Sequence, residues 1–322
     1  MHRRTLLAGL AAGLSVPSIL RAQSAWPDRP VRIIVPFPPG GSTDTIARIF
    51  QPKLSAVLGQ SVVIDNRGGA SGSIGGIEAA RAPADGSTWM LAYDNEATNQ
   101  TLMRLPYKAL EAFAPVSLVA SGPLALVTHQ STPWKSFRDV VAAAKAAPDT
   151  ISYASSGVGG LAHVSTTLLQ QQGGFNLVHV PYRGGGPALQ DAVAGQVPLF
   201  MSNVVIISQH IKAGTLRPLG VTTAAETRHV PGIAPFAAQG FPGFEAPTWW
   251  AFLGRAGTPA PILARMQEAL GQALADPEVR GKIEEQGADV QATGPEACRA
   301  FLAREIERWG RVIRENNIRA DS

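Results

Sequence analysis

The chain has few of the residues that build metal cages, disulfides and catalytic centres. Its 322 residues contain one cysteine, Cys298, so neither an intramolecular disulfide nor a thiolate metal cage can form. The histidines make no H-x-H or H-x-x-x-H pair, and we expect each to be a surface or cap residue. The nearest match to a G-x-S-x-G nucleophile elbow, at Ser71, has Ser73 where the last glycine belongs. We therefore predict no metal, no cofactor and no enzyme activity.

Charged residues are scarce, at 16% of the chain, and close to balanced. There are 28 Lys+Arg against 24 Asp+Glu, and three of the basic residues, Arg3, Arg4 and Arg21, lie within the first 24 residues. Without that segment the chain contains 25 basic and 24 acidic residues, and no run of Lys or Arg remains. This balance argues against nucleic acid as a partner.

Long hydrophobic runs are missing after the first two dozen residues. A basic start at Arg3 and Arg4, an apolar run from Leu6 to Leu14 and small residues up to Ser24 form the three-part layout of a secretory signal. The paired arginines also fit twin-arginine export. We predict that residues 1–24 are a signal peptide and that the mature chain is soluble and periplasmic.

The remaining sequence alternates strands and helices, which is typical of an α/β protein. The β-branched run 31–35 predicts a buried strand, and the proline- and glycine-rich turn after it leads into a helix. Asp44, or Ser42 or Thr43 before it, suits the N-cap of that helix. Since a helix N-terminus attracts anions, we predict that Asp44 caps the helix and is not itself a ligand for an acid.

The same strand–turn–helix pattern returns at 151–172, where residues 155–160 form the glycine turn. A third glycine turn, 181–187, opens a helix predicted over 188–194. The second pattern also fits the looser dinucleotide motif G-x-G-x-x-A, but His179, Pro181 and Tyr182 stand where an acid for the ribose is expected. Repeated turns of this kind favour a binding site for a small anion.

The predicted architecture has two α/β domains with a ligand cleft between them. Proline-rich stretches place the crossings near residues 124 and 245, so that domain I comprises 25–124 and 245–322 and domain II comprises 125–244. Further strands are predicted over 62–64, 88–93, 175–180, 197–201 and 216–222, and further helices over 74–81, 136–147, 206–213, 261–274 and 295–316. The glycine-rich loop 68–72 is predicted to be a turn beside the cleft.

Several motifs together resemble one family. They are the opening stretch 26–37 (WPDRPVRIIVPF), 39–44 (PGGSTD), 180–182 (VPY) with 184–187 (GGGP), and 257–259 (GTP). Their combination is similar to the Bug or TctC-like substrate-binding proteins, the extracytoplasmic receptors of tripartite tricarboxylate transporters. The resemblance implies a type-2 periplasmic-binding-protein fold that closes around a small carboxylate, as a monomer that delivers it to the transporter's membrane components. A sensor that signals to a membrane kinase without transport is the alternative.

The resemblance also implies where the ligand binds. One carboxylate is expected, partly through water, between the turns at 38–44 and 155–160. The predicted ligand-binding residues are Pro38, Gly40, Gly41, Ser42, Thr43, Asp94, Ser155, Ser156, Gly157, Tyr182, Gly184, Gly185 and Asn203. The chain departs from the family at Ser202-Asn203, where an aspartate is common.

The stretch 93–99 suggests a selectivity. It carries Asp94 and Glu96 after the third strand, where many relatives have small neutral residues. If these acids face the far half of the cleft, a second bare carboxylate would be repelled. We then expect a monocarboxylate with a polar or amino distal end rather than citrate. The alternative is that both acids point into water.

Overall fold

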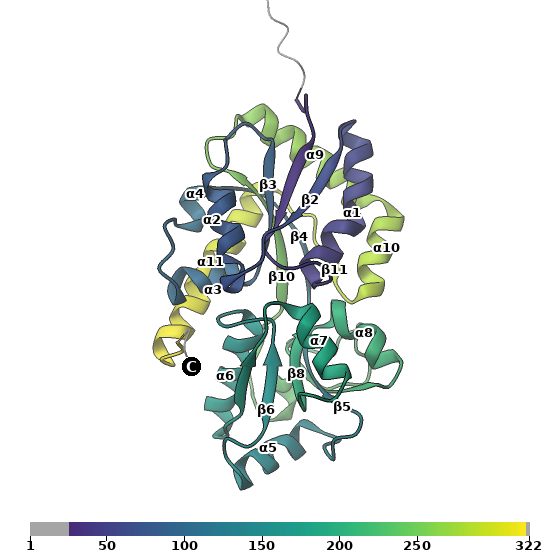
Figure 1. Cartoon of the computed structure of the whole chain (residues 1–322), viewed down its shortest axis with the longest axis vertical. Coiled ribbons are helices and arrows are strands. Elements are labelled where there is room, and N and C mark those ends of the chain that lie inside the picture. The colour runs from purple at the N-terminus through teal and green to yellow at the C-terminus, as the bar shows by residue number, and fades with distance from the viewer. Residues whose placement is uncertain (1–25, 320–322) are drawn as a thin grey trace, which may run out of the picture.

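A computed structural model of the chain describes residues 26–319. Figure 1 shows two lobes stacked along the long axis, each built around its own sheet. The predicted signal peptide, 1–24, lies outside the described residues. Among residues 26–319, no helix has the length and apolar character needed to cross a bilayer.

The first lobe holds a six-stranded sheet in the order β11-β4-β10-β3-β1-β2. Its strands are β1 (Val31–Val35), β2 (Val62–Asn66), β3 (Thr88–Tyr93), β4 (Phe113–Gly122), β10 (Thr248–Arg255) and β11 (Asp289–Val290). The strands β1, β2 and β3 are parallel, whereas β10 runs antiparallel to both β3 and β4. The carboxyl ends of β1 and β3 therefore meet at the edge that faces the second lobe.

The second lobe holds a five-stranded sheet in the order β7-β6-β8-β5-β9. Its strands are β5 (Leu124–His129), β6 (Ser152–Ser155), β7 (Val178–Pro181), β8 (Leu199–Asn203) and β9 (Leu216–Val221). The strand β6 is parallel to β7 and β8, and β5 is antiparallel to β8 and β9. The two sheets are joined at Pro123, between β4 and β5, and again between β9 and β10.

Helices cover both faces of each sheet (Figure 1). On the first lobe, α1 (Ser42–Leu58), α9 (Ala260–Ala275) and α10 (Pro277–Gln286) pack on one face, and α2 (Ser73–Arg81), α3 (Asn95–Leu102), α4 (Ala109–Ala112) and α11 (Pro295–Glu315) on the other. The pleat of β1 explains the division, since Ile33 and Val35 face one hydrophobic cluster while Ile34 faces the other.

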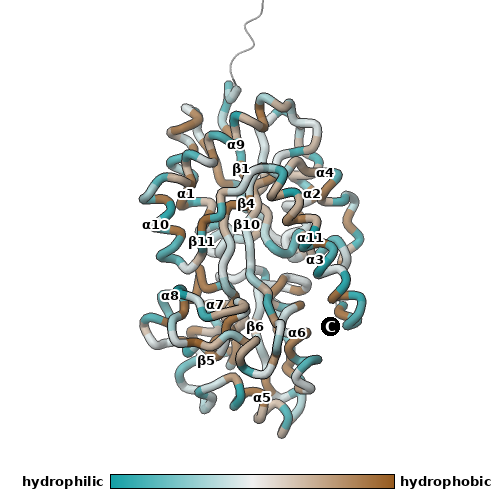
Figure 2. The backbone as a smooth tube through the Cα atoms, turned by 180° about the vertical axis from the view of Figure 1, so that it is seen from behind, coloured by the Kyte–Doolittle hydropathy of each residue, from teal (hydrophilic) through white to brown (hydrophobic). Residues whose placement is uncertain are grey.

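On the second lobe, α5 (Phe137–Ala146) and α6 (Leu161–Gly173) pack on one face, and α7 (Gly185–Val193) and α8 (Val204–Lys212) on the other. The outer helices change between hydrophobic and hydrophilic along their length, as expected for helices with one buried face (Figure 2). The short helices η1 (Ala70–Gly72) and η2 (Phe236–Gln239) lie in connections.

The last helix, α11, reaches from the first lobe to the second. It begins against the first sheet, where Cys298 and Leu302 are buried, and ends with Trp309 and Ile313 in the core of the second lobe. Beyond it, the backbone carbonyl of Asn316 accepts a hydrogen bond from the side chain of Gln171 in α6 at 2.8 Å. The two lobes are thus linked by two chain crossings and by one helix.

The structure differs from the predicted secondary structure in several places. Residues 95–102 form α3, and α7 begins at Gly185 and not at residue 188. The elements β4, β5, β10, β11, α4 and α10 were not predicted. The helix α3 lacks an apolar stripe, because its buried residues are mostly polar: Asn95, Glu96, Thr98 and Asn99. The predicted start of α7 is three residues late, because the helix begins within three consecutive glycines, 184–186.

Asp44 is not the N-cap of α1. The N-cap is Gly41, with no side-chain hydrogen bond, and Asp44 is the third residue of the helix. Its carboxylate instead accepts hydrogen bonds from the Gly40 N–H at 3.0 Å, from Arg48 at 2.9 Å and from Asn66 at 3.1 Å. These hydrogen bonds outweigh burial and lower the pKa of Asp44. Asp44 therefore fixes the turn in front of the helix and leaves the first-turn N–H groups uncapped.

Candidate site between the two lobes

The carboxyl ends of strands from both sheets meet between the lobes. Phe37 follows β1, Tyr93 ends β3, Ser156 follows β6 and Asn203 ends β8. Three adjoining spaces lie there, and Phe37 lines all three: a large outer one and two closely packed inner ones, with volumes of about 10 Å³ and about 0 Å³. Such a position, at the carboxyl ends of strands and between domains, is where α/β proteins bind ligands.

The first inner cavity, called here the anion cavity, receives two helix N-termini from opposite lobes. It is lined by Phe37, Gly41, Ser42, Thr43, Tyr93, Ser156, Gly185 and Asn203. The helices α1 and α7 begin at this cavity, and their N-caps, Gly41 and Gly184, have no side chain to bind the first-turn N–H groups. Those donors and the two helix dipoles give the cavity a positive potential. No lysine or arginine is among the residues that line it.

Hydroxyl groups complete the anion cavity. The Asn203 amide nitrogen donates to Ser42 Oγ at 2.9 Å and to Tyr93 Oη at 3.1 Å, which joins the two lobes. Thr43 Oγ1 accepts a hydrogen bond of 3.3 Å from Trp250. Because Ser42 Oγ and Thr43 Oγ1 already accept a hydrogen bond, each retains its O–H to donate to an anion. The Tyr93 O–H is instead donated to the carboxylate of Asp94.

The second inner cavity, called here the amide cavity, lies beside the first and shares Phe37, Tyr93 and Ser156 with it. Its other lining residues are Ser71, Asn95, Gly157 and Gly160. Ser71 has a positive φ of 51°, an unusual conformation for a residue with a side chain. Its hydroxyl donates to the Val158 carbonyl oxygen of the other lobe, so the loop at 69–72 touches the turn after β6.

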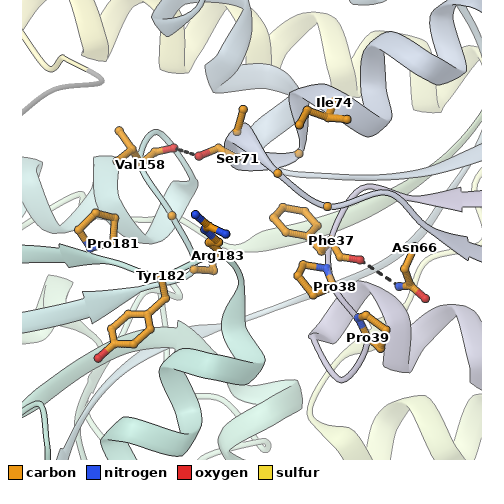
Figure 3. Close-up of a pocket in the computed structure, with 16 residues that line it drawn as sticks. Phe37, Pro38, Pro39, Asn66, Ser71, Ile74, Val158, Pro181, Tyr182 and Arg183 are labelled. Carbon is orange, nitrogen blue, oxygen red and sulfur yellow. Dashed lines mark hydrogen bonds between the residues drawn. The ribbon is translucent and has the colours of Figure 1, made fainter.

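The outer cavity has a volume of about 760 Å³ and opens from the inner ones along the loop 68–72 (Figure 3). Phe37, Pro38 and Pro39 line one side, and Pro181, Tyr182 and Arg183 the other. Arg183 projects between the two sides (Figure 3). The lining is mostly apolar, and no acidic residue is part of it, so this space suits the remainder of an acid rather than a cation.

Two histidines, the buried His163 and the half-buried His179, support the turn after β6, contrary to the expectation that every histidine is a surface or cap residue. His179 Nε2 lies 2.7 Å from Ser155 Oγ, and His163 Nδ1 accepts the Gly159 N–H at 3.1 Å. The two imidazoles stack with their centroids 4.2 Å apart. Burial lowers the pKa of His163 to about 4, so that ring is a neutral acceptor at pH 7.

Asp94 and Glu96 neither face the far half of the cleft nor point into water. Both are buried. Asp94 accepts hydrogen bonds from the Leu161 N–H, at the start of α6, at 3.2 Å and from Thr248 at 2.5 Å. Glu96 accepts from Tyr107 at 3.0 Å, inside the first lobe. Burial raises the pKa of Asp94 to about 7 and that of Glu96 to about 8. The prediction that Asp94 and Glu96 would repel a second carboxylate of the ligand is therefore wrong.

The structure brings most of the predicted site residues to the cavities. Those that line a cavity are Pro38, Gly41, Ser42, Thr43, Ser156, Gly157, Tyr182, Gly185 and Asn203. Four do not: Asp94 is bonded to α6, Ser155 lies beneath its turn, Gly40 donates to Asp44, and Gly184 packs against Pro38. Prediction from the sequence missed Phe37, Ser71, Tyr93, Asn95 and Arg183, although Tyr93 could have been found as the last residue of a predicted strand.

Comparison with known sequences gives one family. The chain matches the family described as "Tripartite tricarboxylate transporter family receptor" over residues 46–318. It is 37% identical over 320 residues to Protein BugT of Bordetella pertussis, with 98% of each chain covered.

Solved structures agree with this match. A periplasmic binding protein named BugD superposes with a TM-score of 0.87 at 30% identity, covering 91% of this chain and 99% of that one. A protein from R. palustris, Rpa4515 with adipate, gives a TM-score of 0.87 at 34% identity and covers 91% and 99%. MatC from Rhodopseudomonas palustris with bound malate gives 0.85 at 29% and covers 89% and 100%. The two-domain periplasmic-binding-protein fold expected from the sequence is confirmed.

Proposed function

Because the chain belongs to the tripartite tricarboxylate transporter receptor family, we propose that it is an extracytoplasmic receptor for a small carboxylate. It binds the acid between the lobes and passes it to the membrane components of a tripartite tricarboxylate-type transporter. Relatives that hold adipate and malate support a carboxylate as the ligand class. The receptor role, in place of catalysis, follows from the family.

One observation carries the proposal: two uncapped helix N-termini, one from each lobe, converge on a single cavity. The cavity has room for about one water, so a carboxylate would enter it as the lobes part. It would accept hydrogen bonds from first-turn N–H groups of α1 and α7 and from the hydroxyls of Ser42 and Thr43. Backbone donors stabilise an anion without a neutralising arginine. The proposed carboxylate contacts are Gly41, Ser42, Thr43, Tyr93, Ser156, Gly185 and Asn203, while Pro38, Gly157 and Tyr182 surround the rest of the acid.

Binding is proposed to close the two domains. We assign 25–124 and 245–322 to domain I and 125–244 to domain II, with the crossings near 124 and 245 as the hinge. The two crossings lie side by side, since Thr222 O accepts from the Ala246 N–H at 2.8 Å and Thr222 Oγ1 accepts from the Leu124 N–H at 3.0 Å. Neighbouring connections of this kind allow a rotation of one domain against the other.

Export as a periplasmic monomer with a cleaved N-terminal signal belongs to the same proposal. Binding by itself does not separate transport from the alternative, a sensor that signals to a membrane kinase. Uptake of radiolabelled acid by cells with and without the receptor separates them. Transport predicts that uptake is lost with the receptor, and a sensor predicts unchanged uptake with altered gene expression.

Isothermal titration of the purified protein tests the binding itself. The panel consists of succinate, malate, adipate and citrate, with their amides as uncharged controls. We expect at least one acid to bind with micromolar or tighter affinity, and its amide not to bind. Failure of every acid, or equal binding of the amides, would contradict the proposal.

A further inference from the structure

A groove on the second lobe lies away from the first lobe, where α5 forms the far end of the molecule (Figure 1). It is called here the α5 groove and has a volume of about 680 Å³. Phe137 and Val141 of α5, together with Phe241, form its apolar part, and the rings of the two phenylalanines lie 5.6 Å apart in the core of the lobe. The side chain of Gln239, which also lines the groove, donates to two backbone carbonyl oxygens at 2.8 and 3.1 Å. The shape of the groove is therefore set by the fold of the lobe.

Two cations border the α5 groove. Arg138 and Lys145 are among the residues that line it, and these include no aspartate or glutamate. Both cations are exposed, and neither forms an ion pair within residues 26–319. Because they stand seven positions apart on α5, they lie on one face of the helix, about 10 Å apart along its axis, with Val141 between them. The groove thus presents two positive charges on either side of an apolar patch.

The needs of the helix do not explain Arg138. It stands in the first turn of α5, where the helix dipole favours acidic residues and disfavours basic ones. That end of the helix is already capped, since Ser136 and Asp139 form a capping box. Lys145, in the last turn, does suit the dipole. A cation that destabilises its own helix and has no ion-pair partner within the described residues indicates a partner outside the chain.

The spacing of the two cations describes that partner. Two carboxylates two turns apart on a helix match Arg138 and Lys145, and an apolar side chain between them would contact Val141. From this match we propose that the α5 groove binds an acidic amphipathic helix of the membrane component to which the receptor delivers its ligand. An anionic lipid surface matches less well, since it attracts clusters of about four to eight basic residues and the groove has two. This inference rests on the proposed transport function.

Receptor-dependent uptake measures the docking. Spheroplasts of the host lose their periplasmic proteins, and purified receptor is added back together with a radiolabelled acid. The acid is whichever of succinate, malate, adipate and citrate binds most tightly in the titration. The receptor concentration that gives half-maximal uptake then reports the affinity for the membrane component. We expect this concentration to increase with ionic strength, because the contacts are between charged groups.

Three charge reversals locate the docking surface. We expect Arg138→Glu and Lys145→Glu each to raise the half-saturating receptor concentration at least about tenfold, with the affinity for the acid unchanged by isothermal titration. Arg138→Glu should melt no lower than the native protein, because an acidic residue suits the first turn of a helix. Lys145→Gln, which only removes a charge, should act in the same direction by less. Lys212→Glu is the matched control, since Lys212 is exposed on α8, on the opposite face of the same sheet, and it should behave as the native protein does.

Each other outcome is decisive. Native half-saturation in both groove variants, or an equal shift in Lys212→Glu, overturns the inference and leaves the carboxylate receptor standing. Loss of acid affinity in the groove variants also overturns it, because the groove would then act on the ligand site. Phosphatidylglycerol vesicles that bind the native protein but not the groove variants would assign the groove to lipid instead. If the native receptor binds an acid but restores no uptake, the proposed transport function falls and the inference with it.

Discussion

The Asn203 amide, on one lobe, donates a hydrogen bond of 2.9 Å to Ser42 Oγ, on the other. Asn203 also donates to Tyr93 Oη, whose own O–H is donated to Asp94. The Ser42 hydroxyl is therefore an acceptor toward Asn203 and a donor toward the anion cavity. One side chain thus links the lobes and sets the direction of the hydrogen bond that a bound carboxylate would receive from Ser42.

Reversing that direction should abolish binding. In Asn203→Asp the new carboxylate would accept from Ser42, so that O–H would no longer be available to the ligand, and its charge would repel an acid. We expect affinity for the best-binding acid to fall more than about a hundredfold, because one hydrogen bond is lost and a like charge is added. Asn203→Ala keeps the Ser42 hydroxyl free to donate and should lose about tenfold or less. Equal losses in the two variants, by isothermal titration, would show that hydroxyl direction is not the cause.

Closure should be sensitive to the space between Pro38 and Gly184. Gly184 has a φ of +127°, and a Cβ built there would stand 3.1 Å from Pro38 Cδ on the other lobe. Gly184→Ala should therefore hold the lobes apart and weaken binding by about tenfold or more. Gly174→Ala is the matched control, since its φ is +59° and nothing lies within 4 Å.

Small-angle scattering measures this closure of the two lobes. The radius of gyration of the native protein should fall when a binding acid is added, and that of Gly184→Ala should fall less. Gly174→Ala should respond as the native protein does. An unchanged radius in the native protein, with an acid proven to bind, would mean that the lobes do not move.

Asp94 makes stability depend on pH. Its pKa in the folded protein is about 7, above the value of 3.8 expected for the unfolded chain, because burial disfavours the charged form. Between those values the folded state holds a proton that the unfolded state has released, so the free energy of unfolding falls as pH rises from about 4 to 7. The loss from this one group is at most about 4 kcal/mol.

Urea unfolding at pH 4.5, 6 and 7.5 measures that slope. Asp94→Asn keeps an acceptor for the Leu161 N–H or for Thr248 and removes the titrating proton, so the slope should become shallower. Glu96→Gln should act in the same direction, since the pKa of Glu96 is raised to about 8. A slope in Asp94→Asn equal to the native one would refute the role of this carboxylate.

Asp44 should matter for stability more than an ordinary helix cap. Asp44→Ala leaves the donors of Gly40, Arg48 and Asn66 without their acceptor, and we expect a cost of about 1–3 kcal/mol in the free energy of unfolding. Arg48→Ala removes only a half-exposed ion pair and should cost less than about 1 kcal/mol. Similar costs for the two variants would place the importance of Asp44 in its ion pair alone.

The sequence was a good guide to elements with local signals and a poor one to groups held by distant contacts. β-branched runs predicted β1, and glycine turns predicted the starts of α1 and α6 to within two residues. The role of Asp94 could not be predicted in this way, because its partners Leu161 and Thr248 lie 67 and 154 residues further along the chain. Glu96 is bonded to Tyr107, which follows it by 11 residues in a stretch for which no element was predicted. The pairing of α1 with α7 at one cavity likewise appears only once both lobes are folded.

A crystal structure of the protein with its tightest-binding acid tests the central claim most directly. The account predicts one ligand carboxylate in the anion cavity, with its oxygens about 2.7–3.2 Å from first-turn N–H groups of α1 and α7, or bridged to them by one water. A carboxylate bound instead at Arg183 in the outer cavity, with the two helix N-termini unused, would contradict it.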